Sequence, residues 1–215
     1  MCSPYVIGVD EVGRGPIAGP VCVAAFILFD YSLLDSCPAP LRDSKKLSQQ
    51  KRDLWYAYLL QAEAESRCAF AHAFVSAEVI DQIGIAPAIA RAIDEALHSL
   101  KESLTVHHEK RSELVEEETR VLLDGGLKAP IRFPKQTTII KGDEKEVPIM
   151  LASIVAKVVR DTYMEECEDT YPGYDFHTHK GYGTKAHYSA LAKHGLSPLH
   201  RKSFLGSVIG TQEAV

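Results

Sequence analysis

The chain has 215 residues, of which 46% are hydrophobic and 25% charged, a composition typical of a globular domain and unlike that of disordered or collagen-like chains. The length suffices for one sizeable hydrophobic core but is short for two full domains. The net charge of −5 at pH 7 gives no general reason to expect a nucleic-acid partner.

The charge is distributed unevenly along the chain. Residues 61–171 carry a net charge of −8, whereas residues 172–215 carry +3 together with five histidines. A basic segment is suited to contact with a polyanion even when the rest of the chain is acidic. An ordinary solvated surface is the alternative interpretation of this segment.

The cysteines and the apolar runs of the sequence indicate the cellular compartment in which the protein works. The five cysteines are an odd number and include no C-x-x-C pair, which argues against a disulfide framework and a zinc site and favours reduced thiols. No apolar run approaches the ~18 residues that a membrane span requires, and the N-terminus lacks the pattern of a signal peptide. We therefore expect a cytoplasmic protein with no membrane partner.

The first predicted elements are two strands joined by a tight turn. Residues 5–10 are rich in β-branched side chains, and residues 21–28 are almost wholly apolar. Three glycines and two prolines lie between them, in residues 13–20, and force the chain to turn. The pattern predicts a hairpin.

Helices and strands alternate through the rest of the chain. We predict helices at 48–63, 76–83, 87–100, 147–171 and 184–194, strands at 67–75, 119–124 and 136–141, and a loop at 172–183. The polar stretch 101–118 is expected to be a helical extension or a solvated insertion. Without an internal repeat or a linker, this order predicts one α/β domain at 1–171, with a small helical extension of the same domain at 172–215.

Four carboxylates stand beside glycines at the expected ends of strands: Asp10, Glu11, Asp124 and Asp143. Functional sites collect at strand ends in α/β folds, and acids without paired cysteines or histidines suit a hard ion such as Mg²⁺ or Mn²⁺. Without a metal, two carboxylates ~4 Å apart would repel each other by on the order of 4 kcal/mol at an intermediate dielectric. A metal site explains such a cluster better than a structural role does.

The local geometry leaves alternatives open. Adjacent strand residues point to opposite faces, so Asp10 and Glu11 can share one site only if the strand ends there, as the following glycines indicate. Taken singly, Asp124 and Asp143 are more typical of plain turns. Asp161 lies four residues after Lys157 on a predicted helix, so we expect an ion pair there and place Asp161 outside the metal site.

Several motifs of the chain resemble those of one enzyme family. The most specific, GVDEVGRGPIAGPV at 8–21, is similar to the N-terminal signature of bacterial ribonuclease HII. Other motifs follow in the family's order: DSKKL at 43–47, LDG at 123–125, KGD at 141–143, ASIVAKVVRD at 152–161, HKGY at 179–182 and SPLHRKSF at 197–204. The resemblance therefore extends over nearly the whole chain.

The resemblance implies a fold and a metal site. The implied fold is ribonuclease H-like, a mixed β-sheet flanked by helices, with a catalytic domain at 1–171 and a substrate-contacting extension at 172–215. The family's metal-binding and catalytic acids fall on Asp10, Glu11, Asp124 and Asp143. They would hold two ions, Mg²⁺ or Mn²⁺, ~4 Å apart around the scissile phosphate, with Asp10 bridging both, Glu11 and Asp124 completing one shell, and Asp143 completing the other.

The resemblance also implies the reaction and its partners. The expected enzyme is an endonuclease that cleaves the RNA strand of RNA–DNA hybrids and single ribonucleotides embedded in duplex DNA. It would cut on the 5′ side of the ribonucleotide and leave 3′-hydroxyl and 5′-phosphate ends. Hybrid duplexes and ribonucleotide-containing DNA are therefore the expected partners, and we expect a monomer.

The same motifs imply residues that contact the substrate. Gly13, Arg14 and Gly15 correspond to the family's Gly-Arg-Gly element, and glycines let a backbone approach the 2′-hydroxyl that distinguishes RNA from DNA. A simple hairpin turn is the alternative interpretation. Tyr182 corresponds to the family's substrate-sensing tyrosine, with a tyrosine that caps the core as the alternative.

Weaker expectations concern other polar residues. Ser44 and Lys45 precede a predicted helix and are expected to hold backbone phosphates, with a solvated helix entry as the alternative. Histidines 177, 179 and 200 could shuttle protons but are more typical of plain surface residues. Cys22 and Cys68 lie in apolar strands and are expected in the core.

The chain departs from the family pattern in places. Gly183 stands where proline usually follows the tyrosine, Glu144 and Met150-Leu151 replace small residues, and the stretch 101–118 is longer. None of these positions is one of the four acids, so substrate preference is affected more than activity. The alternatives to ribonuclease HII are a ribonuclease HIII-like nuclease of the same fold and a non-catalytic hybrid-binding module.

Overall fold

The computed structural model describes residues 5–42, 44–107 and 113–206. Asp43 of the DSKKL motif, the middle of the polar stretch 101–118 and the last nine residues of the predicted extension lie outside the described residues. Within the described ranges, no helix combines the length and the apolar character that crossing a membrane requires.

The centre of the structure is a five-stranded mixed sheet in the order β3-β2-β1-β4-β5. β1 pairs antiparallel with β2, and β2 pairs antiparallel with β3, whereas the β1–β4 and β4–β5 pairs are parallel. The predicted hairpin is therefore confirmed, and the sheet is mixed as expected. The strands are Val6–Val12 (β1), Val21–Leu28 (β2), Cys68–Val75 (β3), Arg120–Asp124 (β4) and Gln136–Ile139 (β5).

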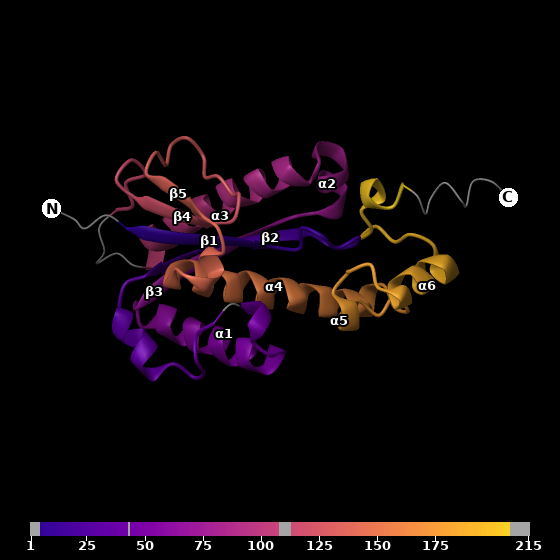
Figure 1. Cartoon of the computed structure of the whole chain (residues 1–215), viewed down its shortest axis with the longest axis horizontal. Helices are drawn as coiled ribbons and strands as arrows, with labels where there is room; N and C mark the ends of the chain where they lie inside the picture. Colours follow the sequence, from indigo (N-terminus) through magenta and orange to yellow (C-terminus); the bar gives the residue numbers. More distant parts are fainter. Residues whose placement is uncertain (1–4, 43, 108–112, 207–215) are drawn as a thin grey trace.

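Helices cover both faces of the sheet (Figure 1). One face carries α2 (Ala77–Ile83) and α3 (Ile85–His107), and the other carries α1 (Gln49–Ala64) and α4 (Val147–Thr170). Successive side chains of β2 enter the two cores in turn, so that Val23 packs with the α3 layer and Ala24 with the α1 and α4 layer. Every residue of β2 is buried, which explains its wholly apolar sequence. Cys22 and Cys68 are core residues, as predicted.

A smaller third core lies beyond the end of the sheet, where α4 extends to meet α5 (Phe176–His179) and α6 (Lys185–His194) (Figure 1). The segment 17–19 joins this core to the main body. The amide of Ile17 donates to the carbonyl of Gly181 at 3.0 Å, and the amide of Gly19 donates to the carbonyl of Leu199 at 2.8 Å. The turn after β1 is thereby bonded to the C-terminal part of the chain.

Most predicted boundaries lie within two residues of those observed, with informative exceptions. The helix α3 continues to His107, so the start of the polar stretch is a helical extension. Leu104 and Leu114 within that stretch are buried, and a solvated insertion is wrong for these two positions. The predicted loop 172–183 contains the short helix α5. Short 3₁₀ helices occur at Tyr31–Ser36, Ser44–Lys46, Gly142–Glu144 and Lys202–Phe204.

Candidate metal centre and active site

Three aspartates from three elements meet at one edge of the sheet. Asp10 comes from β1, Asp124 ends β4, and Asp143 belongs to the 3₁₀ helix Gly142–Glu144. Each offers a carboxylate oxygen within 4.8 Å of the other two. β1 and β4 are parallel neighbours, so their carboxyl ends lie together, where ligand sites form in sheets of this kind. The structure thus brings together three of the four predicted acids.

The turn before Asp143 is built around Gly142. The amide of Gly142 donates to Asp124 Oδ1 at 2.7 Å, and the amide of Asp143 donates to the same oxygen at 3.4 Å. A Cβ atom at position 142 would lie 2.6 Å from Ile149 Cδ1, so a larger residue here would have to displace the end of the Ile149 side chain. These bonds fix one oxygen of Asp124 and leave Oδ2 for a ligand.

A second glycine lets α4 approach β1 beside Asp10. A Cβ atom on Gly8 would lie 2.1 Å from the carbonyl carbon of Pro148 and 2.4 Å from the amide of Ile149. The close approach places Ser153 of α4 where its side chain hydrogen-bonds to Asp10. Ser153 Oγ also lies 2.7 Å from Ser44 Oγ, which links the segment before α1 to the acidic cluster.

Glu11 differs from the expectation in its geometry. β1 does not end at Asp10: it continues to Val12, which pairs with Cys22 of β2. Successive residues of a strand point to opposite faces, and Glu11 is not among the three mutually close carboxylates. The expectation that the strand ends at Asp10 is therefore wrong, although the charge of Glu11 still raises the pKa of Asp10. Glu11 instead lies beside the cluster, with its Oε1 3.8 Å from Arg14 Nη1.

The electrostatics of the cluster follow from burial and like charge. Burial raises the pKa of Asp10 well above its ordinary value, and the charges of Glu11 and Asp124 raise it further. Burial and the charge of Asp124 also raise the pKa of Glu11. The ammonium of Lys45 lies 3.2 Å from Asp143 Oδ2. These oxygen ligands therefore fit a hard divalent cation, which would favour their charged forms.

The other residues predicted to contact substrate lie in the turn after β1 and in the C-terminal part of the chain. Arg14 and Gly15 are exposed, and Tyr182 is 42% exposed, which fits either a substrate contact or a tyrosine that caps the core. A hollow of about 180 Å³ lies between Arg14 and Lys128, over Ile89 and Leu127. The hollow adjoins the loop that follows Asp124 and extends the site along the α3 face.

Ser44 and Lys45 occupy different environments. Ser44 is 2% exposed, and its hydroxyl is bonded to Ser153 rather than turned outward. The side chain of Lys45 is exposed while its ammonium contacts Asp143. Ser44 therefore forms part of the floor beneath the cluster, whereas Lys45 lies at its rim.

The structure confirms the prediction for Asp161 and corrects the prediction for two of the loop histidines. Lys157 Nζ lies 2.8 Å from Asp161 Oδ1, so the predicted ion pair is confirmed, and Arg52 Nη2 lies 3.7 Å from Asp161 Oδ2. His179 and His200 are 8% and 2% exposed, so the expectation of plain surface residues is wrong for both. Their aromatic neighbours in the third core explain their burial.

Sequence reasoning missed two arginines near the site. Arg160 and Arg201 are fully buried and donate to backbone carbonyls around the segment 13–20. One signal was available: Arg160 lies on the apolar stripe of α4 that also carries Ala156 and Met164, where a cation needs a special partner. The sequence holds no comparable signal for Arg201.

Comparisons with known proteins agree with this arrangement. The family model "Ribonuclease HII" matches residues 7–206. The ribonuclease HII of Shouchella clausii is 46% identical over 201 residues, which cover 93% of this chain and 68% of that protein. The ribonuclease H2 of Pyrococcus horikoshii OT3 superposes with a TM-score of 0.71 at 20% identity, over 98% of this chain and 100% of the other.

The fold is shared more widely than the sequence. A structure of Bst-RNase HIII in complex with Mn²⁺ superposes with a TM-score of 0.68 at 17% identity, over 99% of this chain and 71% of the other. The fold alone therefore leaves ribonucleases HII and HIII unseparated, whereas the family model and the relative at 46% identity both carry the HII name. With its acidic cluster in place, the chain belongs to the ribonuclease HII family of metal-dependent endoribonucleases.

Proposed function

We propose that this enzyme cleaves the RNA strand of RNA–DNA hybrids and also single ribonucleotides embedded in duplex DNA, leaving 3′-hydroxyl and 5′-phosphate ends. The observation that carries the proposal is the meeting of Asp10, Asp124 and Asp143 at one sheet edge, next to the exposed Arg14 and Gly15. Metal-dependent cleavage of a phosphodiester needs the aspartate cluster. Selection of ribonucleotides also needs groups beside the cluster that contact the 2′-hydroxyl.

The aspartates would hold two Mg²⁺ or Mn²⁺ ions. Bound there, the ions would activate a water for in-line attack and stabilise the departing 3′ oxygen. The chain's own contribution is to fix the ligands: the amide of Gly142 holds Oδ1 of Asp124, and Ser153 holds the carboxylate of Asp10. Glu11, whose charge raises the pKa of Asp10, would complete the set of ligands.

Substrate reading is assigned to two segments that the structure places next to each other. The backbone of Gly13, Arg14 and Gly15 would contact the ribose of the scissile nucleotide, and the ring of Tyr182 would stack on the sugar. Support comes from the bond between the carbonyl of Gly181, the neighbour of Tyr182, and the amide of Ile17 at 3.0 Å. Each of the two segments therefore lies within two residues of this backbone hydrogen bond.

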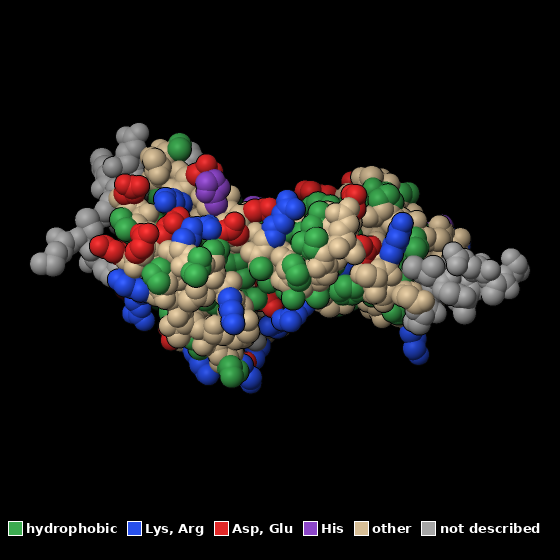
Figure 2. Space-filling model, turned by 90° about the horizontal axis from the view of Figure 1, so that it is seen from above, with side chains coloured by type: hydrophobic (Ala, Val, Ile, Leu, Met, Phe, Trp, Pro, Cys, Tyr) green, Lys and Arg blue, Asp and Glu red, His purple; other side chains and the backbone are tan. Residues whose placement is uncertain are grey.

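Contacts with the phosphates of the substrate are assigned to a few lysines, because the described residues form no large basic patch on the face drawn in Figure 2. On the face drawn in Figure 2, lysines and arginines are interspersed with acidic side chains. Lys45 lies at the rim of the site, with Ser44 behind it, and Lys185 begins α6 on the exposed side. Lys180 is 9% exposed and its ammonium contacts Glu165 at 2.7 Å, so this lysine joins the C-terminal part of the chain to α4 and is not assigned a phosphate contact.

Organisation and location follow from the same family. We propose a cytoplasmic monomer in which residues 1–171 form the catalytic domain and residues 172–215 form an extension of that domain that contacts the substrate. The third core, where α5 and α6 pack on the end of α4, contains buried residues of both parts, which supports an extension of the same domain rather than a separate domain.

The test is cleavage of a duplex that carries one ribonucleotide in otherwise all-DNA strands, with Mg²⁺ and with Mn²⁺ separately. The proposal predicts one cut on the 5′ side of the ribonucleotide, and a product that a DNA polymerase extends because it ends in a 3′-hydroxyl. An all-DNA duplex of the same sequence is the control. Equal cutting of both duplexes, or cutting of long hybrids only, would contradict the proposal.

A further inference from the structure

Two arginines near the site are buried in an unusual way. Arg160 and Arg201 are each 0% exposed, and no ion pair joins either of them to a carboxylate of the described residues. Burial lowers the pKa of both guanidinium groups. A buried charge is costly unless hydrogen bonds compensate for it, so the bonds that these side chains do make need an explanation.

The side chain of Arg201 is bonded to the turn that follows β1. Its Nη2 donates to the carbonyl of Gly13 at 2.7 Å, its Nη1 to the carbonyl of Arg14 at 3.2 Å, and its Nε to the carbonyl of Gly19 at 2.9 Å. All three nitrogens of the fork are therefore used on three carbonyls of one loop. A lysine ammonium lacks the planar fork needed to reproduce this pattern.

These bonds determine which way two amide groups point. A peptide unit is planar and trans, so its N–H points away from its C=O. The carbonyl of Gly13 shares a peptide unit with the amide of Arg14, and the carbonyl of Arg14 shares one with the amide of Gly15. With both carbonyls turned inward to Arg201, both amides face outward, and neither has a hydrogen-bond partner among the described residues. Arg14 and Gly15 are exposed, so these donors are open to a ligand.

Arg160 holds the other end of the same loop. It donates to the carbonyls of Pro20 at 2.9 Å, Ala18 at 3.3 Å and Lys180 at 3.0 Å. The last bond joins the loop to the residues just before Tyr182. The phenol of Tyr182 also lies near enough to both guanidinium groups to affect their pKa values, so the two arginines lie between the two reading segments.

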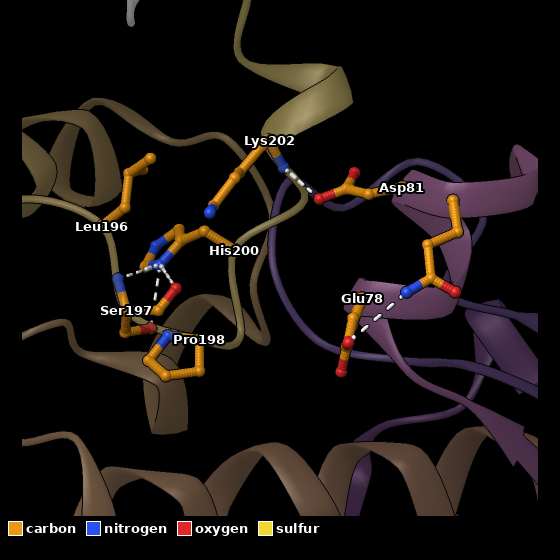
Figure 3. A pocket seen from close by; sticks show the side chains of 8 residues that line it. Glu78, Asp81, Leu196, Ser197, Pro198, His200 and Lys202 are labelled. Carbon is orange, nitrogen blue, oxygen red and sulfur yellow. Dashed lines mark hydrogen bonds between the residues drawn. The ribbon is translucent and has the colours of Figure 1, made fainter.

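Arg201 is itself held from three sides. Its amide donates to the carbonyl of Ile17 at 2.8 Å, and its guanidinium lies over the ring of Phe204, 5.2 Å from the centroid. Figure 3 shows the third contact: Asp81 of α2 accepts a hydrogen bond from the amide of Lys202, the residue after Arg201, at 2.8 Å. Both residues line a hollow of about 700 Å³. The same view shows His200, the residue before Arg201, bonded to Ser197.

We propose that Arg201 is a positioning residue for ribonucleotide selection: it turns the amides of Arg14 and Gly15 toward the 2′-hydroxyl of the scissile nucleotide. The substrate contact is made by the backbone, and Arg201 acts only through it. This inference rests on the proposed function, since it assumes that the loop reads a ribose. It explains why a buried cation without a carboxylate partner is bonded to carbonyls of the reading loop.

The test is Arg201→Lys, which keeps the charge and loses the fork. Single-turnover cleavage of a duplex with one ribonucleotide should slow by ~100-fold at saturating enzyme, the size of effect expected when a reacting group is misplaced by about 1 Å. Affinity for an all-DNA duplex of the same sequence should stay within about 3-fold, because phosphates supply most of the affinity. Any preference of the wild type for binding the ribonucleotide-containing duplex should disappear.

A control variant and a second variant keep the test decisive. Arg67→Lys alters an arginine that pairs with Asp30 at 2.9 Å, away from the loop, and should cleave at the wild-type rate. If Arg201→Lys does not fold, Asp81→Ala removes the contact between α2 and Lys202 without touching the core, and should slow cleavage several-fold with unchanged affinity for DNA. Cleavage at the wild-type rate by folded Arg201→Lys would overturn the inference. If Arg201→Lys does not fold, cleavage at the wild-type rate by Asp81→Ala would overturn it. A wild type that does not cleave this duplex would instead overturn the proposed function.

Discussion

Asp161 differs from the three clustered aspartates in what balances its charge. Lys157 and Arg52 both lie within 4 Å of its carboxylate, whereas Asp10 and Asp124 face other carboxylates. A carboxylate that already has two cations gains little from a metal ion. The side chain is therefore assigned to holding α4 against α1, which carries Arg52.

We predict that Asp161→Asn lowers the cleavage rate by less than about 10-fold, whereas Asp124→Asn lowers it by more than about 100-fold, as loss of a group that acts directly on the reacting centre does. Asp161→Asn should also lower the free energy of unfolding by about 1–3 kcal/mol, because it leaves buried cations without their partner. Single-turnover rates and urea unfolding measure the two effects. Equal rate losses in the two variants would show that Asp161 belongs to the metal site.

Tyr182 offers a test of substrate reading that leaves the acids unchanged. The tyrosine is 42% exposed, so replacing it removes little from the core. Tyr182→Ala should slow cleavage of a single embedded ribonucleotide by about 10-fold or more while weakening duplex binding by less than about 3-fold, because phosphates supply most of the affinity. A small loss in Tyr182→Phe would assign the role to stacking. Unchanged cleavage by stable Tyr182→Ala would reject the role in substrate reading.

The contact between β1 and α4 depends on a single glycine. A Cβ atom on Gly8 would overlap the backbone of Pro148 at 2.1 Å, and backbone atoms cannot turn aside as a side chain can. Gly8→Ala should therefore destabilise the protein by about 2 kcal/mol or more, since overpacking in a core commonly costs 1–3 kcal/mol. It should also lower activity, because Ser153 moves with α4. Gly126→Ala is the matched control, as a Cβ there meets nothing within 4 Å; equal stability of the two variants would contradict this account.

The agreement between sequence and structure varies from element to element for physical reasons. The strand β2 matches its prediction at both ends because an unbroken apolar run lies between Pro20 and a change to polar residues. The end of α3 was left open between a helical extension and a solvated insertion, because the polar surface of the helix hides the buried Leu104. β1 runs past Asp10 because pairing with β2 continues to Val12, a tertiary contact that local composition does not encode. Glu11 nevertheless lies close enough to Asp10 for its charge to raise the pKa of that carboxyl.

The third core adds a pH dependence to the whole molecule. His187 donates from Nδ1 to the carbonyl of Tyr182 at 2.9 Å, and its Nε2 lies 3.0 Å from His200 Nε2. Because the amide of Ser197 donates to His200 Nδ1, the proton between the two rings belongs to His200, and His187 accepts it. Burial lowers the pKa of His187 to about 4, so the folded state keeps this ring neutral.

The sign of the resulting effect is fixed by proton uptake. Between pH 6.5 and 4 the unfolded chain binds a proton at His187 that the folded chain does not, so this contribution to stability is full above pH 6.5 and falls as the pH falls. Relative to His187→Asn, the wild type should lose up to about 2.5 kcal/mol of unfolding free energy between pH 7 and pH 4.5. Urea unfolding at both pH values measures the difference. A constant difference between the two proteins would show that the ring takes up its proton at the same pH in the folded and the unfolded chain.

At the scale of the molecule, local features such as strand ends and glycines predicted the order of the elements and three clustered aspartates, whereas the mixed sheet was implied by the family resemblance. The sequence did not predict the bonds of Arg201 to Gly13 and Arg14, which join residues about 190 positions apart. Contacts of this kind depend on how the C-terminal part of the chain folds back over the turn after β1. That return also brings the carbonyl of Gly181, the residue before Tyr182, to the amide of Ile17.

The central claim is that the aspartate cluster performs the cleavage, and Asp10 lies at its centre. Asp10→Asn keeps the size of the side chain and removes its charge. The most direct measurement is single-turnover cleavage of a duplex with one ribonucleotide by this variant in Mg²⁺, with circular dichroism and thermal unfolding as checks on the fold. The account predicts a folded protein that is at least as stable as the wild type, because a buried repulsion is relieved, and that cleaves more than about 1,000-fold more slowly. A folded Asp10→Asn protein that cleaves at a rate near that of the wild type would contradict the account.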